Sequence, residues 1–599
     1  MPAEQRLAAT AGVRHPALAA LLVEHWDWKL REAPVWATTL GDHRFDEELR
    51  KHALRDIERR RRDRRRFLAG AKPLWEQLAE GSSDRTTLAL LIELLQKEVR
   101  AEVCQAHRWT VSAFDNPLKR FGMLSEQHKL TSFERAATLL ARYRKIPTSI
   151  ESTIANLRDG LNDGLVANAE SVARTIKMFD AELNKPLAEW ALLAPLKRLD
   201  TLTSWDAQER ARWAEHLQQV VRDEIRPALE RYRKMLSEEV TPEARPRGKA
   251  GVGALPQGAD CYRARIHSYT DLSRTAEELH RLGKKENARI GKAMRRLGAK
   301  LFRTRSLKRI LERLRTDKEL YFKEPEDIVA AARSALARAN GALPRYFGLL
   351  PKTPCEVRPV PAYEAPYSTI AYYQPPHLDG SKPGEYFINT YKPEVRPRFE
   401  MQVLAYHEAV PGHHLQIALG QELGQLPAFR RLLGSTAFVE GWALYTERLA
   451  DEMGLYSGDL DRMGQLSYAA WRASRLVVDT GLHAMGWTRA RAERYMYEHT
   501  ALTESNISNE VDRYLAWPGQ ALAYKVGELE IMALRKQARR SLGGRFDIKA
   551  FHDVVLGGGA VSLGVLRSQV ERWIAGERAK AGVRGRVRSA ASRSESKPR

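Results

Sequence analysis

Hydrophobic positions along most of the chain recur every three or four residues, which is the spacing of one buried face of an α-helix. From Ala17 to Glu238 this pattern is almost continuous, with Leu, Ala, Arg and Glu as its main residues. It resumes at Thr275 and runs again from Phe399 nearly to Gly576. The pattern therefore predicts a mainly α protein built from many helices.

Two segments interrupt the helical pattern. Residues 241–260 (TPEARPRGKAGVGALPQGAD) contain three Pro and four Gly, a composition that cannot sustain a helix. The block from Glu356 to Pro393 is instead rich in Tyr, Pro, Ile and Val, which is typical of short strands. We therefore expect a linker at residues 241–260 and a small β-sheet around residues 355–392.

Apolar runs and cysteines bear on the compartment of the protein. No stretch of about 18 uncharged apolar residues occurs, and the first residues lack the pattern of a signal peptide. The cysteines Cys104, Cys261 and Cys355 lie far apart without a CxxC spacing, so neither a disulfide framework nor a cysteine metal site is predicted. These features predict a cytoplasmic protein that does not enter a membrane.

Positive charge is concentrated in a few segments. The 599 residues carry 98 Lys and Arg against 75 Asp and Glu, a formal net charge of +23. The run Arg59–Arg66 is interpreted as a solvated helix face, and Arg578–Arg599 as a basic disordered tail that binds polyanions without specificity. Nucleic-acid motifs and interleaved aromatic residues are missing, so no specific nucleic-acid partner is predicted.

The sequence HEAVPGHHLQ, which begins at His407, carries the clearest chemical signal. In zinc hydrolases one helix presents two histidines four residues apart as ligands, and a Glu beside the first acts as general base. His407 and Glu408 fit the start of this pattern, but the fourth residue after His407 is Pro411. The regular spacing therefore fails, and the second ligand has to come from further along the chain.

His413 and His414 are the candidates for the second ligand. On a regular helix, His413 would lie about 120° away from the face of His407, and His414 about 10.5 Å along the axis. Pro411 cannot donate a hydrogen bond to the carbonyl of His407, so the helix has to open there. With Gly412 beside it, two residues can bulge out and bring His413 to the ligand position. We therefore favour His413 over His414. His414 is expected to contact a metal ligand without binding the metal, or to face the substrate.

The third ligand is expected on a following helix. The sequence FVEGWALYTERL (Phe438–Leu449) places Glu440 near a predicted helix start and Glu447 two turns later. Two His and one Glu leave a coordination position open for water, as hydrolysis requires. We therefore predict one zinc ion held by His407, His413 and Glu440. For Glu447, a hydrogen bond to a ligating histidine is favoured over direct coordination.

Several ordered motifs resemble the bacterial domain-of-unknown-function 885 family. They are HEAVPGHHLQ, EGWALYTE, DTGLHAMGW and DRYLAWPGQALAYKVG, with LPQGADCY and AYYQPPHLDGSKPGEYFINT upstream, so the resemblance covers about Ala17 to Gly576. The resemblance implies a mostly helical fold that is related to the zinc peptidases of the gluzincin type. In those peptidases the third ligand is a Glu on a second helix. Family patterns keep the histidine at the position of His413 and vary the one at His414.

Further residues are candidates for catalysis. Asp479 and His483 are four residues apart on a predicted helix, so the carboxylate could orient the imidazole as a hydrogen-bond donor to an oxyanion. The phenol of Tyr514 is a second candidate donor. A structural, hydrogen-bonded role for His483 is the alternative.

Four other side chains are candidates for substrate binding. Arg513 and Lys525 flank a Pro-Gly turn, and such cations suit a substrate carboxylate, which would indicate exopeptidase-like cleavage. Tyr524 is a further phenol donor. Tyr373 could line a cleft through its strand backbone. Ion pairing for the two cations and strand packing for Tyr373 are the alternatives.

Together these features predict a large multi-helix metallopeptidase-like fold. We expect an extension at residues 1–16, an N-terminal helical half at 17–240, the linker at 241–260, a catalytic half at 261–576 and the tail at 577–599. The predicted activity is zinc-dependent hydrolysis of a peptide or small amide, with Glu408 as general base. The alternatives are a nonproteolytic peptide-binding or scaffold protein and a hydrolase of a nonpeptide amide or ester.

Overall fold

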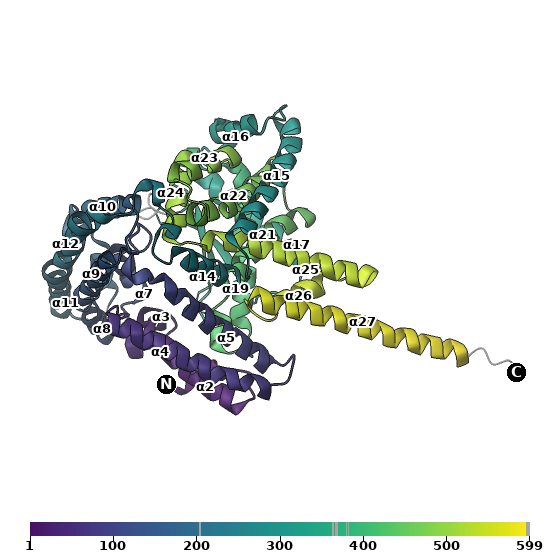
Figure 1. The fold of residues 1–599 in the computed structure, drawn as a ribbon, viewed down its shortest axis with the longest axis horizontal. Helices are drawn as coiled ribbons and strands as arrows, with labels where there is room; N and C mark the ends of the chain where they lie inside the picture. The colour runs from purple at the N-terminus through teal and green to yellow at the C-terminus, as the bar shows by residue number, and fades with distance from the viewer. Residues whose placement is uncertain (203–204, 362–364, 366–368, 379, 381, 595–599) are drawn as a thin grey trace. The chain divides into compact units, whose positions relative to one another are not determined.

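The protein consists of helices throughout, with one small β-sheet (Figure 1). The computed structural model describes residues 1–202, 205–361, 365, 369–378, 380 and 382–594. This architecture confirms the predicted mainly α fold. Within these residues, every helix is too short or too polar to span a bilayer.

The helices before the sheet follow the predicted periodicity. Each begins or ends where capping residues, Pro or Gly stop the pattern. They are α1 (Ala3–Thr10), α2 (Pro16–Glu32), α3 (Pro34–Thr39), α4 (Leu54–Ala71), α5 (Ser83–Arg100), α6 (Pro117–Gly122), α7 (Leu124–Gln127), α8 (Phe133–Tyr143), α9 (Ile146–Asn162), α10 (Ala169–Leu183), α11 (Ala207–Gln219), α12 (Arg226–Met235), α13 (Thr241–Glu243), α14 (Gly258–Thr270), α15 (Ala276–Leu301), α16 (Leu307–Thr316) and α17 (Pro325–Tyr346).

The helices after the sheet include those that carry the chemical motifs. They are α18 (Met401–Glu408), α19 (His413–Glu422), α20 (Ala428–Leu432), α21 (Thr436–Glu452), α22 (Asp459–Ala484), α23 (Arg489–His499), α24 (Glu504–Ala516), α25 (Ala523–Leu542), α26 (Ile548–Leu556) and α27 (Leu563–Ser594). The helix α27 extends through most of the stretch from residue 577 that was expected to be disordered, because Ala and Arg are strong helix formers. Residues 595–599 lie outside the described residues.

The chain forms two compact units. Unit 1 contains residues 1–268, 478–495 and 504–519, and unit 2 contains residues 269–477, 496–503 and 520–599. Two segments from the C-terminal half thus belong to unit 1. The expected linker at residues 241–260 also lies within unit 1, where a Cβ on Gly251 would come within 1.8 Å of the carbonyl oxygen of Leu482. This stretch is packed rather than extended, because its glycines allow close backbone contact.

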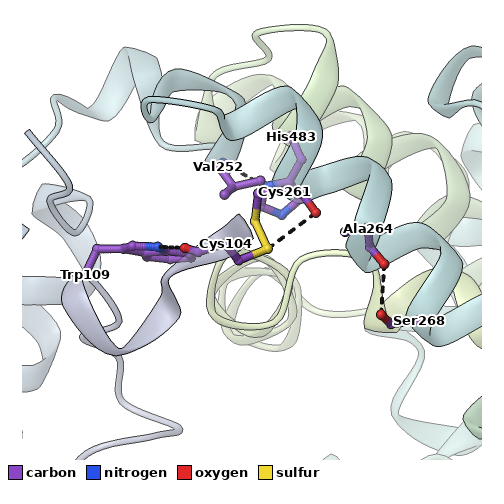
Figure 2. The surroundings of a disulfide bond; sticks show 7 residues. All are labelled: Cys104, Trp109, Val252, Cys261, Ala264, Ser268 and His483. Carbon is purple, nitrogen blue, oxygen red and sulfur yellow. Dashed lines mark hydrogen bonds between the residues drawn. A yellow bond between two sulfur atoms is a disulfide. The ribbon is translucent and has the colours of Figure 1, made fainter. Parts of the chain in front are cut away.

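A disulfide closes a long loop within unit 1 (Figure 2). Cys104 follows α5 and Cys261 lies in α14, 157 residues later, and their Cα atoms are 4.6 Å apart. The prediction that the chain has no disulfide is therefore wrong. Its basis was the wide spacing of the cysteines, which says nothing about the distance between them once the helices pack. Cys355 is a free cysteine.

The predicted sheet is present and has three strands. They are β1 (Cys355–Pro359), β2 (Ala371–Gln374) and β3 (Gly384–Ile388), in the order β1-β3-β2. The pair β1–β3 is parallel and the pair β2–β3 is antiparallel, with Tyr373 opposite Tyr386. Among the described residues, β2 therefore has a strand partner on one side only.

Two glycines allow α21 and α25 to pack closely in unit 2. α21 packs extensively against α25, and a Cβ on Gly441 would lie 2.4 Å from the Cα of Gly527. A Cβ on Gly527 would in turn lie 1.8 Å from the carbonyl oxygen of Ala437. Any larger side chain would separate the two helices. Glu440 on α21 directly precedes this crossing.

Candidate metal centre

The helix that carries His407 stops where Pro411 predicts an interruption. α18 ends at Glu408 and α19 begins at His413, and the Val410–Pro411 peptide between them is cis. The backbone N–H of His414 donates to the carbonyl of Ala409 at 3.0 Å, which joins the two helices across the break. The break places His407 and His413 on two separate helices, with Pro411 and Gly412 between them.

Gly412 makes this break possible. A Cβ at this position would lie 2.0 Å from the carbonyl oxygen of His407 and 2.4 Å from that of Tyr406. Trp442 on α21 donates its indole N–H to the carbonyl of Pro411 at 2.9 Å, which fixes the bulged residues from the other side. The segment is therefore tightly held, and only glycine fits at residue 412.

His407, His413 and Glu440 come together in unit 2. One potential ligand atom from each lies within 4.8 Å of the others. Oε2 of Glu440 is 3.9 Å from Nε2 of His407 and 3.6 Å from Nε2 of His413. The two imidazole rings are nearly perpendicular, with centroids 4.8 Å apart. Two imidazoles and one carboxylate suit zinc, and they leave a coordination position for water or substrate.

Glu447 orients the first of these histidines. Its Oε1 lies 2.8 Å from Nδ1 of His407, and both side chains are buried. The carboxylate favours the tautomer with the proton on Nδ1, which leaves Nε2 as the donor atom. Burial lowers the pKa of His407 well below its usual value, and the nearby His413 lowers it further, so the imidazole is neutral, as a metal ligand must be.

His414 is engaged elsewhere. Its Nε2 lies 3.0 Å from the carbonyl oxygen of Thr353, and the hydroxyl of Tyr373 lies 3.0 Å from its Nδ1. Burial lowers the pKa of His414 to about 4. A Cβ on Gly384 would come within 2.4 Å of its Nδ1, so the ring is enclosed as well as hydrogen-bonded. This geometry leaves neither nitrogen of His414 for a metal and favours His413.

Glu408 is placed beside the cluster and has a high pKa. Burial raises its pKa to about 7, the neighbouring Glu440 contributes in the same direction, and His413 opposes it. The backbone of Tyr373 in β2 hydrogen-bonds to the carboxylate. A carboxylate with a pKa near 7 can accept a proton and release it again at neutral pH, as a general base must.

Two nearby residues were not predicted from the sequence. Tyr386 in β3 is fully buried, its hydroxyl has no hydrogen-bond partner in the described part of the chain, and burial and the charge of Glu408 raise its pKa. Arg472 in α22 is buried against the rings of Tyr468 and Trp471, and its charge lowers the pKa of Glu408 and of Glu447. Tyr386 lies in the motif AYYQPPHLDGSKPGEYFINT, but nothing in that motif marks it for chemistry, and Arg472 lies outside the motifs, so the fold reveals the position of both.

His483 does not have the surroundings that its predicted catalytic role needs. It lies in unit 1, where its Nδ1 accepts the N–H of Val252 and its Nε2 donates to the carbonyl of Tyr514, both at 3.0 Å (Figure 2 shows the contact with Val252). Asp479 does not orient it but accepts hydrogen bonds from Tyr262 and Gly519. This arrangement corresponds to the structural alternative for His483.

Tyr514 and Arg513 also belong to unit 1. The Tyr514 hydroxyl donates to Glu510 at 2.7 Å, and the side chain is buried. Arg513 lies 3.7 Å from the same carboxylate group and is partly exposed. The phenol of Tyr514 is thus occupied by a carboxylate one helical turn away, contrary to its predicted role as a donor to substrate.

Lys525 and Tyr524 lie inside unit 2. Lys525 is completely buried, and its ammonium is 2.5 Å from Glu528 and 3.6 Å from Glu286. It is therefore an internal ion pair rather than a substrate-binding cation. Tyr524 is also buried, with the guanidinium of Arg475 over its ring at 4.4 Å. Tyr373 donates its hydroxyl to His414 and hydrogen-bonds to Glu408 through its backbone, so its phenol is not available to a substrate.

The chain belongs to the family described as bacterial protein of unknown function, domain of unknown function 885. The family matches residues 34–570, which include the candidate metal centre and both units. The predicted resemblance to this family is confirmed. No curated protein matches the chain.

Two solved structures are similar to this protein over nearly its whole length. A candidate lipoprotein from Colwellia psychrerythraea is 26% identical, with a TM-score of 0.86 over 93% of this chain and 99% of its own. A candidate lipoprotein of unknown function from Shewanella oneidensis is 19% identical, with a TM-score of 0.71 over 92% of this chain and 98% of its own. A candidate oligoendopeptidase F from Bacillus anthracis is 11% identical, with a TM-score of only 0.30 over 85% of this chain and 92% of its own.

Proposed function

We propose that the protein is a zinc-dependent hydrolase that cleaves peptide bonds. The observation that carries this proposal is the convergence of His407, His413 and Glu440, with Glu408 next to the first ligand. The zinc, when bound, supplies a Lewis acid that acidifies water and polarises a carbonyl group. This donor set fits zinc better than a hard cation, because Mg²⁺ and Ca²⁺ prefer oxygen ligands.

Glu408 is the proposed general base. It removes a proton from the attacking water and delivers it to the leaving amine, and its raised pKa suits both transfers near neutral pH. The Tyr386 hydroxyl lies close enough to Glu408 for the carboxylate charge to raise the pKa of the phenol. It is our candidate for a phenol that donates to the developing oxyanion, in place of His483 and Tyr514.

The strand β2 supports an extended peptide as the substrate. It is an edge strand of the sheet, and its Tyr373 backbone hydrogen-bonds to Glu408, so its unpaired side lies beside the general base. An extended peptide can pair with such an edge through main-chain hydrogen bonds. Whether cleavage is internal or terminal depends on groups beyond this strand.

The test compares Glu408→Gln with wild-type protein on a mixed peptide library read by mass spectrometry. We expect zinc to remain bound and cleavage to fall at least about a hundredfold. Glu498→Gln, on the exposed surface of α23, is the matched control and should keep full activity. Full cleavage by Glu408→Gln would refute the mechanism. Peptide binding without turnover in the zinc-loaded wild type would instead favour a nonproteolytic peptide-binding protein.

We also propose that the protein matures in an oxidising compartment rather than in the cytoplasm. The disulfide between Cys104 and Cys261 supports this, because such bonds are rare where thiols are kept reduced. Two similar structures are of candidate lipoproteins, which agrees with it. Free thiols are alkylated in whole cells before lysis, and alkylation is repeated after the protein is denatured. Mass spectrometry should then find Cys104 and Cys261 unmodified and Cys355 alkylated. Two alkylated thiols at residues 104 and 261 would contradict this location.

A further inference from the structure

A large cavity lies in unit 1, among residues that the proposed hydrolysis does not use. Its volume is about 860 Å³, and all its lining residues come from helices and loops between residues 33 and 265. Binding sites for small molecules usually enclose about 300–1,000 Å³. The cavity is therefore large enough for a small organic ligand, and it is separate in the chain from the metal ligands of unit 2.

The lining of the cavity is strongly cationic. Seven Arg and Lys side chains line it against three carboxylates. Each carboxylate already has a partner: Glu98 bonds to Arg64 at 2.8 Å, Glu102 bonds to Arg65 at 2.5 Å, and Asp115 bonds to Arg120 at 3.0 Å. Two further lining cations pair with carboxylates outside the cavity, Arg60 with Glu32 and Arg61 with Glu58. The surplus of positive charge that faces the cavity therefore belongs to Arg50, Lys119 and Arg265.

In the described part of the chain, three lining cations have no ion-pair partner: Lys119, and the guanidinium groups of Arg50 and Arg265. Neither guanidinium forms a hydrogen bond within the described residues, and the Nε of Arg265 is buried. The Arg50 side chain is exposed to solvent, and partial burial of its guanidinium together with repulsion from Arg60 and Arg64 lowers its pKa to about 10. A guanidinium in such a position keeps its charge at neutral pH and gains most from an anionic ligand.

Two histidines that line the same cavity have pKa values lowered by burial and by the positive charges of its lining. Burial lowers the pKa of His52 to about 3, and the charges of Arg120 and Arg50 lower it further. For His107 burial lowers the pKa to about 4, with Arg61 as the next cause. Both imidazoles are therefore neutral at pH 7, and their nitrogens can hydrogen-bond a ligand without adding charge.

Apolar side chains complete the lining. Leu49, Phe121, Leu124 and Tyr232 are buried core residues of unit 1 that also border the cavity. A wall of this kind favours a ligand with an apolar body, while the guanidinium groups select an oxyanion. An inorganic ion alone would leave the apolar wall and most of the volume unused.

We propose that this cavity binds a small organic anion, in which a carboxylate or phosphate group pairs with Arg50 and Arg265 and an apolar body lies against Leu49, Phe121 and Leu124. The two head groups share the same recognition by guanidinium. Their relative affinity identifies the class of the natural ligand.

Isothermal titration of the purified full chain with octyl phosphate and with octanoate tests the proposal. We expect saturable binding of at least one of them, much weaker binding of inorganic phosphate, and no binding of octylammonium. Arg50→Met and Arg265→Met should each weaken binding about tenfold. Arg55→Met is the matched control, because its side chain is 91% exposed and does not line the cavity.

Thermal unfolding of each variant separates loss of binding from loss of folding. Arg50→Met should unfold at the wild-type temperature or higher, because it removes repulsion from Arg60 and Arg64. The proposal is overturned if neither octyl compound binds the wild type, if octylammonium binds as well as the anions, or if folded Arg50→Met and Arg265→Met both bind like Arg55→Met. None of these results depends on zinc or on peptide cleavage.

Discussion

Oε1 of Glu447 lies 2.8 Å from Nδ1 of His407, so a carboxylate on α21 fixes the ring orientation of a histidine on α18. The same helix also supplies Glu440. One helix therefore provides both a candidate ligand and the group that orients another ligand, which makes the relative position of α18 and α21 decisive for the metal centre.

Glu447→Gln should weaken zinc binding by about tenfold or more, because the amide can still accept the Nδ1 proton but lacks the charge that makes the imidazole a stronger donor. Competition with a chromophoric chelator measures the affinity. Glu452→Gln on the same helix is the control, since its carboxylate bonds to Arg535 at 3.0 Å. Equal affinities in the two variants would show that Glu447 does not act on the metal.

His413→Gln and His414→Gln should differ in metal content. The first removes a proposed ligand and should release zinc, as measured by plasma mass spectrometry after gel filtration. The second alters a ring held by Thr353 and Tyr373, so it should keep about one zinc per chain while lowering the unfolding temperature. Zinc retained by His413→Gln and lost from His414→Gln would reverse the assignment.

Gly412→Ala should destabilise the protein by about 3 kcal/mol or more and reduce zinc binding, because its Cβ would overlap the carbonyl oxygens of His407 and Tyr406. Gly420→Ala in α19 is the control. A Cβ there meets nothing within 4 Å, so this change should be neutral or stabilise the helix by up to about 1 kcal/mol. Chemical denaturation checks both values, and similar unfolding free energies would contradict the packing argument.

Loss of the disulfide should weaken unit 1. The double variant Cys104→Ser with Cys261→Ser opens a loop of 157 residues and should lower the free energy of unfolding by about 2–5 kcal/mol. A reducing agent should destabilise the wild type by a similar amount and leave the double variant unchanged. Cys355→Ser should respond to the reductant like the wild type, since its thiol is free.

Asp479 should make stability depend on pH. Burial raises its pKa to about 7, against hydrogen bonds from Tyr262 and Gly519 that lower it. The folded state therefore binds this proton more tightly than the unfolded state, in which the pKa is near the ordinary value of about 3.9. Between these values the folded state holds more protons, so stability falls as pH rises, by up to about 1.4 kcal/mol per pH unit.

Urea unfolding at pH 5, 6, 7 and 8 checks this prediction against Asp479→Asn, which keeps a hydrogen-bond acceptor but does not titrate. The wild type should lose stability relative to the variant from pH 5 to pH 7 and little more above pH 8. A constant difference across this range would mean that Asp479 is already ionised in the folded protein.

Local sequence rules account for much of the fold. Helical periodicity predicted the helices, and the Tyr- and Pro-rich block predicted the sheet. The interruption at Pro411 was also predictable, because a proline in that position removes a helix hydrogen bond whatever surrounds it. The distance between Cys104 and Cys261 was not, since it depends on how distant helices pack.

The roles of single polar residues were harder to predict. Lys525 and His483 stand in family motifs, yet both are buried with internal partners. Lys525 pairs with the nearby Glu528 and the distant Glu286, and His483 bonds to backbone groups. Tyr386 lies in a family motif that does not indicate its role, because its importance comes from its position beside Glu408. Which groups a buried polar side chain bonds to depends on how the chain packs, and the spacing of residues in the sequence does not predict it.

The contact between Gly441 and Gly527 bears on how small a working fragment of this protein can be. Because α25 fits against the helix that holds Glu440, a shortened chain that ends before Gly527 would leave Gly441 on α21 uncovered. The motifs between His407 and Glu440 span fewer than forty residues of sequence. The smallest self-standing metal-binding piece must nevertheless extend more than eighty residues beyond them.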